Sequence, residues 1–329
     1  MNVPSADSVV QATNDDATVS RCSASQAGYF HDPFVSQLVR RPARRSPVIN
    51  RGTYCRLVGL QNLIRQFLDA CRNQQLPSQI VSLGAGFDTT YFLLKTDQKA
   101  PNHYFEVDFA ETTAKKVMSI QRKSALKTIL EDGWTTGNGG TELWSYDYTV
   151  IAGDLRGFET TVVPALERRG FDRTLPTLFL SECVLIYLDP THSDAIIRWV
   201  SQHVPTAMFT TYEPIGPHDA FGQMMVQNLE MRRIELKGLL AYPDLASQQQ
   251  RYYDLGWPSA QAMDMATLYA QLPPGELQRL MRIEILDELE EFNLFGRHYC
   301  IAWAWQSRTL PLLDPLTALD PSKPTPTRP

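Results

Sequence analysis

The stretch Gln79–Lys95 (QIVSLGAGFDTTYFLLK) constrains the fold of this chain more than any other part of the sequence. Residues 80–83 predict a short buried strand, and Gly84 and Gly86 predict a tight turn directly after it. Residues 88–90 can cap the helix that follows. A strand, a glycine turn and a helix form the first crossover of a nucleotide-type α/β fold, in which glycine lets the main chain approach a ligand.

Further strands and helices alternate along the chain. Apolar patterning predicts strands at 103–109, 148–155, 178–180, 207–214 and 298–305, and helices at 51–73, 111–130, 162–169 and 191–204. This alternation predicts a mostly parallel sheet with right-handed crossovers. Residues 131–145 are rich in glycine and predict a surface loop. Residues 215–280 break the alternation, and their two long helical segments predict a helical insertion that covers the substrate.

The two ends of the chain differ from its middle in composition. Residues 1–25 are rich in Ser, Thr, Asp and Gln and predict a flexible N-terminal arm. Residues 307–329 hold several prolines without periodicity and predict a flexible C-terminal tail. The expected folded domain is therefore 26–306. The basic run at 40–45 predicts either a solvated connector or a docking or import patch.

Composition excludes several classes of protein. The net charge of −5 and the pI near 5.7 give no basic footprint for nucleic acid. The sequence has no run of eighteen apolar residues, so it predicts no transmembrane helix. The polar N-terminus lacks the apolar core of a secretory signal. The five cysteines are scattered, which argues against a disulfide framework or a metal site and favours a reducing intracellular compartment. The expected location is the cytoplasm, and the nucleus in addition. Nothing in the sequence demands more than a monomer.

Acidic residues follow the second, third and fourth predicted strands. Asp108 lies 22 residues after Gly86, the spacing at which an acid receives ribose hydroxyls in dinucleotide and related folds. Asp154, followed by Leu155, and Glu182 stand at the next two strand ends. Each acid alone could be a helix cap or a solvated loop residue. Together they suit a ligand with a ribose, an exocyclic amine and an amino acid end.

A phosphate-binding site fits this pattern poorly. The chain has no GxxxxGK[ST] motif, and Thr89 stands where GxGxxG would carry its third glycine. An acidic pocket also repels pyrophosphate. The sulfonium nucleoside S-adenosylmethionine suits the acids better, and Arg56 is the candidate cation for its carboxylate because a guanidinium can grip a carboxylate as a fork.

Several segments together resemble the leucine carboxyl methyltransferase family: INRGTYCRLVG, VSLGAGFDTTYFLLK, HYFEVDF, GDLR, LFLSECVLIYL, FGQMMVQNL and HYCIAWAW. The resemblance runs from about Arg21 to Trp305. It implies a class I S-adenosylmethionine-dependent methyltransferase, with a Rossmann-like seven-stranded sheet and a helical substrate cover. It also implies methylation of the C-terminal leucine of the protein phosphatase 2A catalytic subunit.

The resemblance also implies the roles of individual residues. Arg56 would hold the methionine carboxylate, the turn at Gly84 would approach the methionine moiety, and Asp108 would accept the ribose hydroxyls. Asp154 and Leu155 would frame the adenine, and Glu182 would contact the methionine amino end. Arg21 stands where the family has a lysine, and the two side chains differ in geometry.

Tyr187 is the candidate catalytic residue, lining the methyl or substrate channel, with core packing as its alternative role. No general base is expected, because a C-terminal carboxylate has a pKa of about 3.3–3.7 and is ionised at neutral pH. His31, His192 and His298 are expected to be structural, and Cys183 is expected to be a buried thiol beside the site.

Two alternatives remain open from the sequence. One is a methyltransferase of the same superfamily that acts on a small molecule or a modified tRNA base. The tRNA-acting relatives carry an additional repeat domain for which this chain is too short. The other is a non-catalytic protein that binds the phosphatase.

Overall fold

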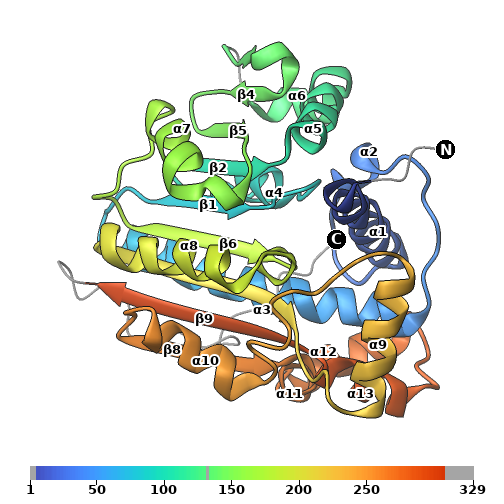
Figure 1. Ribbon diagram of the computed structural model, residues 1–329. Coiled ribbons are helices and arrows are strands. Elements are labelled where there is room, and N and C mark those ends of the chain that lie inside the picture. Colours follow the sequence, from blue (N-terminus) through green and yellow to red (C-terminus); the bar gives the residue numbers. More distant parts are fainter. Residues whose placement is uncertain (1–4, 131–132, 308–329) are drawn as a thin grey trace.

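The computed structural model describes residues 5–130 and 133–307, and within these ranges the chain forms one sheet of nine strands with helices on both faces (Figure 1). The strands are β1 (Gln79–Leu83), β2 (His103–Asp108), β3 (Thr135–Gly137), β4 (Glu142–Trp144), β5 (Tyr148–Ala152), β6 (Thr177–Glu182), β7 (Thr206–Pro214), β8 (Ser259–Asp264) and β9 (Tyr299–Ser307). Their order across the sheet is β3-β4-β5-β2-β1-β6-β7-β9-β8.

The centre of the sheet is parallel and its edges are antiparallel. Strands β5, β2, β1, β6 and β7 pair in parallel, and β9 lies antiparallel between β7 and β8. The strand order reverses between β1 and β6, which makes that position the switch point of a doubly wound fold. The predicted α/β class is confirmed. The six strands predicted from the sequence correspond to β1, β2, β5, β6, β7 and β9. The described sheet has nine strands, two more than the seven that the family resemblance implies.

Helices flank the sheet throughout the described residues. They are α1 (Ala6–Ala27), α2 (Val35–Leu38), α3 (Pro47–Asn73), α4 (Thr90–Thr96), α5 (Ala110–Arg122), α6 (Ser124–Lys127), α7 (Val163–Arg168), α8 (Pro190–His203), α9 (Ala220–Met231), α10 (Leu245–Asp254), α11 (Met265–Ala270), α12 (Pro274–Ile283) and α13 (Leu289–Arg297). Short turns of 3-10 helix include η3 (Leu155–Gly157) and η5 (Leu185–Tyr187). No helix in the described ranges is both long and apolar enough to cross a membrane.

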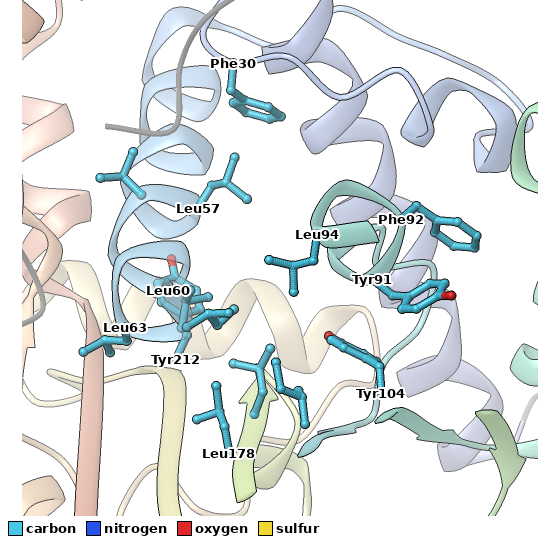
Figure 2. Close-up of a cluster of buried hydrophobic side chains, with 14 of the residues drawn as sticks. Phe30, Leu57, Leu60, Leu63, Tyr91, Phe92, Leu94, Tyr104, Leu178 and Tyr212 are labelled. Atoms are coloured by element: carbon cyan, nitrogen blue, oxygen red, sulfur yellow. The ribbon is translucent and has the colours of Figure 1, made fainter. Parts of the chain in front are cut away.

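Each face of the sheet carries its own apolar core, because neighbouring side chains on a strand point to opposite faces. On β1, Ile80 joins the core under α3, α4 and α5, whereas Val81 joins the core under α7, α8 and α10. Figure 2 shows the first core, where Leu57 and Leu60 of α3 face Leu178 of β6. These buried side chains are the apolar positions from which the sequence predicted the strand and the helix.

The N-terminal prediction is wrong. Residues 6–25 belong to helix α1, whose N-cap Ser5 accepts a hydrogen bond from the amide of Ser8. The buried positions of α1 include Thr18, Ser23 and Ala24, so the helix packs through small and polar side chains. It lacks the stripe of large apolar residues by which helices are recognised in a sequence. The predicted tail at 308–329 lies outside the described residues.

Two further segments differ from their predictions. The glycine-rich segment at 131–145 contains the strands β3 and β4, which were predicted as loop. The segment 259–264, predicted as helix, is the edge strand β8 and pairs with β9. Neither difference is visible in local patterning, because an edge strand of three to six residues depends on its partner for its hydrogen bonds.

A buried ion pair lies beneath the glycine turn. Lys116 of α5 pairs with Glu106 of β2, and each side chain is 1% exposed. Lys116 Nζ also donates to the main-chain oxygen of Asp88 at 2.8 Å, and the Tyr148 hydroxyl donates to Glu106 at 2.9 Å. Burial raises the pKa of Glu106 to about 7, although Lys116 opposes that shift. The pair therefore ties α5 to the loop that carries Asp88.

We expect Lys116→Met to lower the free energy of unfolding by about 3–5 kcal/mol, because it leaves the Glu106 carboxylate buried without a cation. The double variant Lys116→Met/Glu106→Gln should recover most of that loss, since no charge remains buried. Urea unfolding at neutral pH measures both values. If the double variant is less stable than Lys116→Met alone, the destabilisation does not come from an unpaired charge.

Candidate active site

A cavity of about 690 Å³ opens at the carboxyl ends of β1, β2, β5 and β6. The residues that the sequence singled out all line it: Arg21, Arg56, Gly84, Asp108, Asp154, Leu155, Glu182 and Tyr187. They come from six separate parts of the chain, from α1 to η5. The structure thus brings the whole predicted set together, and the role of each residue stays a proposal.

Strand register explains this convergence. Leu83 of β1 pairs with Ser181 of β6 and with Val107 of β2, so Gly84, Glu182 and Asp108 follow at the same level. Asp108 in turn pairs with Ala152 of β5, which places Asp154 two residues beyond that strand end. Parallel strands in register must deliver the residues after them to one edge of the sheet.

The two glycines of the turn are required by their own backbone. Gly84 has φ 63° and Gly86 has φ 52°, a region that side-chain-bearing residues rarely adopt. A Cβ on Gly84 would lie 2.4 Å from Val184 Cγ2, and one on Gly86 would lie 2.3 Å from Asn14 Oδ1. Protein side chains therefore occupy the space beside both glycines. The sequence had attributed the glycines to the close approach of a ligand.

Asp108 is anchored to the turn it faces. Its two carboxylate oxygens accept hydrogen bonds of 2.7 Å from the amides of Gly86 and Phe109. Burial raises the pKa of Asp108 above its ordinary value, and these amides oppose the shift. The carboxylate is fixed in place, and each oxygen retains a lone pair for a further donor.

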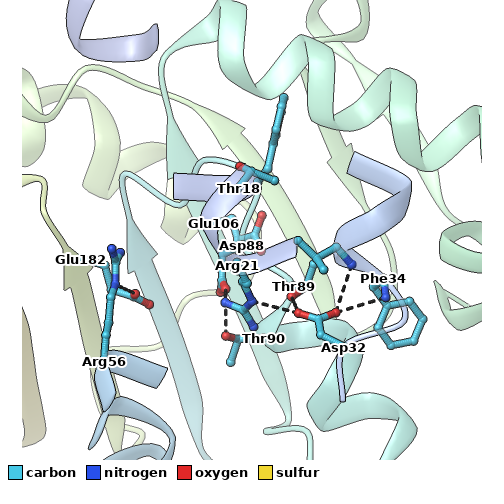
Figure 3. Close-up of polar contacts among 12 residues, drawn as sticks. Thr18, Arg21, Asp32, Phe34, Arg56, Asp88, Thr89, Thr90, Glu106 and Glu182 are labelled. Carbon is cyan, nitrogen blue, oxygen red and sulfur yellow. Dashed lines mark hydrogen bonds and ion pairs between the residues drawn. The ribbon is translucent and has the colours of Figure 1, made fainter. Parts of the chain in front are cut away.

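Arg56 and Glu182 form a pair on the wall of the cavity. Arg56 Nε lies 2.8 Å from Glu182 Oε2, and its guanidinium carbon lies 4.7 Å from the centre of the Tyr212 ring (Figure 3 shows the pair). Burial disfavours the charge, yet Glu182, Cys183 and Tyr212 together hold the pKa of Arg56 above its ordinary value. Arg56 is thus a permanent cation with a fixed orientation. Its terminal nitrogens are not used by the bond to Glu182.

Asp154 is already engaged. It caps η3 by accepting from the Arg156 amide at 2.9 Å, and the Arg156 side chain donates to both of its oxygens. Arg156 also reaches Asp7 of α1 at 2.8 Å. Sequence reasoning did not identify Arg156 as a site residue, because it stands one position after Leu155 on a solvent-facing turn.

Helix α1 forms a wall of the cavity that the sequence did not predict. Asn14 Oδ1 accepts from the Phe87 amide at 2.9 Å, and Arg21 contacts Asp32 and Asp88. Thr13 and Asp7 also line the cavity from this helix. The available sequence signal was the N-cap Ser5, three residues before Ser8, which is weak without an apolar stripe.

Tyr187 and Cys183 lie on the loop after β6. Burial raises the pKa of Tyr187 above its ordinary value, so it remains a protonated phenol at neutral pH. Cys183 has φ 55°, which is unusual for a residue other than glycine. It is half-buried, where the sequence predicted a buried thiol, and it lines the cavity. Of the three histidines expected to be structural, His192 also lines the cavity.

The family model for leucine carboxyl methyltransferases matches residues 9–201. The chain belongs to this family. It is 41% identical over 296 residues to the leucine carboxyl methyltransferase 1 homolog of Arabidopsis thaliana, covering 90% of this chain and 88% of that protein. It is 38% identical over 302 residues to leucine carboxyl methyltransferase 1 of Rattus norvegicus, covering 91% and 90%.

The chain is also similar to a protein whose name refers to tRNA modification. The chain is 39% identical over 307 residues to the tRNA wybutosine-synthesizing protein 4 of Homo sapiens, covering 92% of this chain and 44% of that protein. Family membership supports carboxyl methylation as the general chemistry. The names of these relatives refer to different substrates, so similarity alone does not identify the substrate of this chain.

We expect the Cys183 thiol to react slowly, because burial raises its pKa to about 12 and leaves little thiolate. Alkylation by iodoacetamide at pH 8 should be roughly a thousandfold slower at Cys183 than at an unperturbed cysteine. Peptide mass spectrometry after timed labelling measures the rate, with urea-denatured protein as the control. Equal rates in the folded and denatured protein would show that the environment of Cys183 is not protective.

Proposed function

We propose that this protein transfers the methyl group of S-adenosylmethionine to the α-carboxylate of the C-terminal leucine of the protein phosphatase 2A catalytic subunit. The observation that carries the proposal is the convergence of Asp108, Asp154, Glu182 and Arg56 on one cavity, in a chain of the leucine carboxyl methyltransferase family. Methyl esterification removes the negative charge of that terminus. The loss of this charge would regulate the assembly of the phosphatase.

The lining of the cavity fits the chemistry of this cofactor. Asp108 would accept the ribose hydroxyls, and its carboxylate is already fixed by two amides. Arg56 and Arg21 would hold the methionine carboxylate, with Glu182 near the amino group. Leu155, which is 7% exposed, would pack against the adenine. Asp154 can contact the adenine amine only by sharing its carboxylate with Arg156.

The reaction requires alignment more than proton transfer. When bound, S-adenosylmethionine supplies a methyl group on a positively charged sulfur. The accepting carboxylate is ionised at neutral pH and needs no base. Tyr187 keeps its proton, so it can donate a hydrogen bond that orients the substrate but cannot remove a proton. The cavity walls, helix α1 among them, would exclude water from the reacting atoms.

Basic side chains of the segment after α9 lie at one side of the cavity. The substrate tail would enter from the side of the segment after α9, because Arg232, Arg233 and Lys237 line the cavity there. This segment belongs to the predicted substrate cover. We infer that the protein acts as a monomer in the cytoplasm or nucleus, where the phosphatase tail would meet it.

We expect Arg56→Ala to weaken S-adenosylmethionine binding by about 10- to 100-fold, because a charged hydrogen bond contributes about 1.5–3 kcal/mol. Isothermal titration calorimetry measures the affinity, and the melting temperature checks the fold. Arg122→Ala is the matched control, since this exposed arginine at the end of α5 does not line the cavity. Unchanged cofactor affinity in Arg56→Ala would reject the assigned site.

The substrate is tested with radiolabelled S-adenosylmethionine and the purified phosphatase catalytic subunit. We expect label on the intact subunit, released by alkali as an ester should be, and no label on a subunit that lacks its terminal leucine. Label on the truncated subunit would reject carboxyl methylation at that residue. Label on tRNA or on a small acceptor in place of the phosphatase would favour the corresponding alternative, and failure to label any acceptor would favour a non-catalytic binder.

A further inference from the structure

Two aspartates hold the guanidinium of Arg21. Arg21 Nε lies 2.8 Å from Asp32 Oδ2, and Nη1 lies 2.6 Å from Asp88 Oδ1 (dashed in Figure 3). The third nitrogen, Nη2, is buried and has no hydrogen-bond partner among the residues that the structure describes. Arg21 also lines the cavity, so a ligand bound there lies beside this side chain.

Asp88 provides the complementary acceptor. Its Oδ1 accepts from Arg21 and from Thr90 Oγ1 at 3.0 Å, and its main-chain oxygen accepts from Lys116. Its second carboxylate oxygen, Oδ2, is also buried and lacks a hydrogen-bond partner within the described part of the chain. Asp88 lines the same cavity as Arg21, and its side chain is 11% exposed.

Buried polar atoms without partners are rare and destabilising in folded proteins. A donor and an acceptor on two bonded, adjacent side chains therefore point to a ligand that carries both an acceptor and a donor. An α-amino acid does so, because its carboxylate and its ammonium share one carbon atom. A phosphate would satisfy Arg21 but would bring its negative charge against Asp88.

Asp32 fixes this arrangement. Besides Arg21, its carboxylate accepts from Thr89 Oγ1 at 2.5 Å and from the amides of Phe34 and Val35, and the residue is 3% exposed. It therefore joins α1 to the N-terminal end of α4 and to the start of α2. With Nε and Nη1 both engaged, the guanidinium cannot rotate, and Nη2 keeps its direction.

Both partners carry their charges at neutral pH. Burial alone would raise the pKa of Asp88, but Arg21 and Lys116 outweigh burial and hold that pKa below its ordinary value. Burial also disfavours the charge on Arg21, yet Asp88, Asp32 and Glu182 hold the pKa of Arg21 above its ordinary value. Glu182 is also the partner of Arg56 on the wall of the cavity.

We propose that Asp88 is a cofactor-binding residue whose second carboxylate oxygen accepts a hydrogen bond from the ammonium of the amino acid end of S-adenosylmethionine, while Arg21 Nη2 donates one to its carboxylate. This inference rests on the proposed function. It adds to the sequence assignment a second acidic partner for the ammonium. Glu182 already gives one oxygen to Arg56, whereas Asp88 Oδ2 has no partner within the described residues.

If Asp88 binds the ammonium, its substitution should lower the affinity only for ligands that carry the amino acid end. Asp88→Asn keeps the size of the side chain and removes its charge. We expect this variant to bind S-adenosylhomocysteine about 10- to 100-fold more weakly, since an ammonium–carboxylate contact is lost. Its affinity for methylthioadenosine, which lacks the amino acid end, should stay within about twofold of the wild type. Calorimetry on the full chain measures both, with the exposed Asp97→Asn as the matched control.

A change in the ligand tests the same contact from the side of the ammonium. The S-adenosylhomocysteine analogue with hydrogen in place of the α-amino group should bind the wild type more weakly by a similar factor. Asp88→Asn should weaken binding of that analogue no further. If both ligands lose affinity equally in Asp88→Asn, or if S-adenosylhomocysteine loses none, Asp88 is not an ammonium ligand.

The wild type separates the failure of this inference from the failure of the proposed function. If the wild-type protein binds neither S-adenosylhomocysteine nor methylthioadenosine, the proposed function fails, and the assignment of Asp88 falls with it. If it binds both, and removal of the α-amino group leaves the affinity unchanged, only the assignment of Asp88 is overturned. Where Asp88→Asn melts below the assay temperature, the titrations are repeated at a temperature at which this variant is folded, because a loss of affinity in the wild type alone could also come from Glu182.

Discussion

The in-register parallel pairing of β1 with β2 and β6 is the constraint on which the cavity depends. Because Leu83 faces both Val107 and Ser181 across the ladders, the residues after the three strands emerge side by side. The strand order reverses at this point in the sheet, so the crossovers diverge and leave an opening between them. A slip of one residue in either pairing would turn the side chains of that strand to the opposite core.

Charged side chains from three parts of the chain contact one another around the glycine turn. Lys116 reaches it from α5, Arg21 reaches it from α1, and Asp88 lies between them. Removing charges from water is unfavourable unless partners replace the lost hydration, so these elements are held to one another. This explains how α1, which has few large apolar residues, is fixed over the cavity. Its placement depends on polar contacts with Phe87, Asp32 and Asp88.

Family membership and fold do not by themselves decide the substrate. Relatives at similar identity carry names that refer to leucine carboxyl groups and to a modified tRNA base. The wall formed by the segment after α9 is the part of the cavity where such differences can arise. Arg232, Arg233, Glu235 and Lys237 reach the cavity from this segment, outside the strand ends that the fold itself positions.

The sequence by itself determined the α/β class, the order of the central strands along the chain and the residues at their carboxyl ends. These features are local, since strand periodicity, glycine at positive φ and acids after strands are each encoded within a few residues. Only the tertiary structure placed α1 over the cavity and added β3, β4 and β8 to the sheet. It also decided that Arg156 engages Asp154 and that Arg21 Nη2 and Asp88 Oδ2 lack partners within the described residues. These features depend on contacts between residues far apart in the chain, such as Arg21 with Asp88, and no local pattern specifies such contacts.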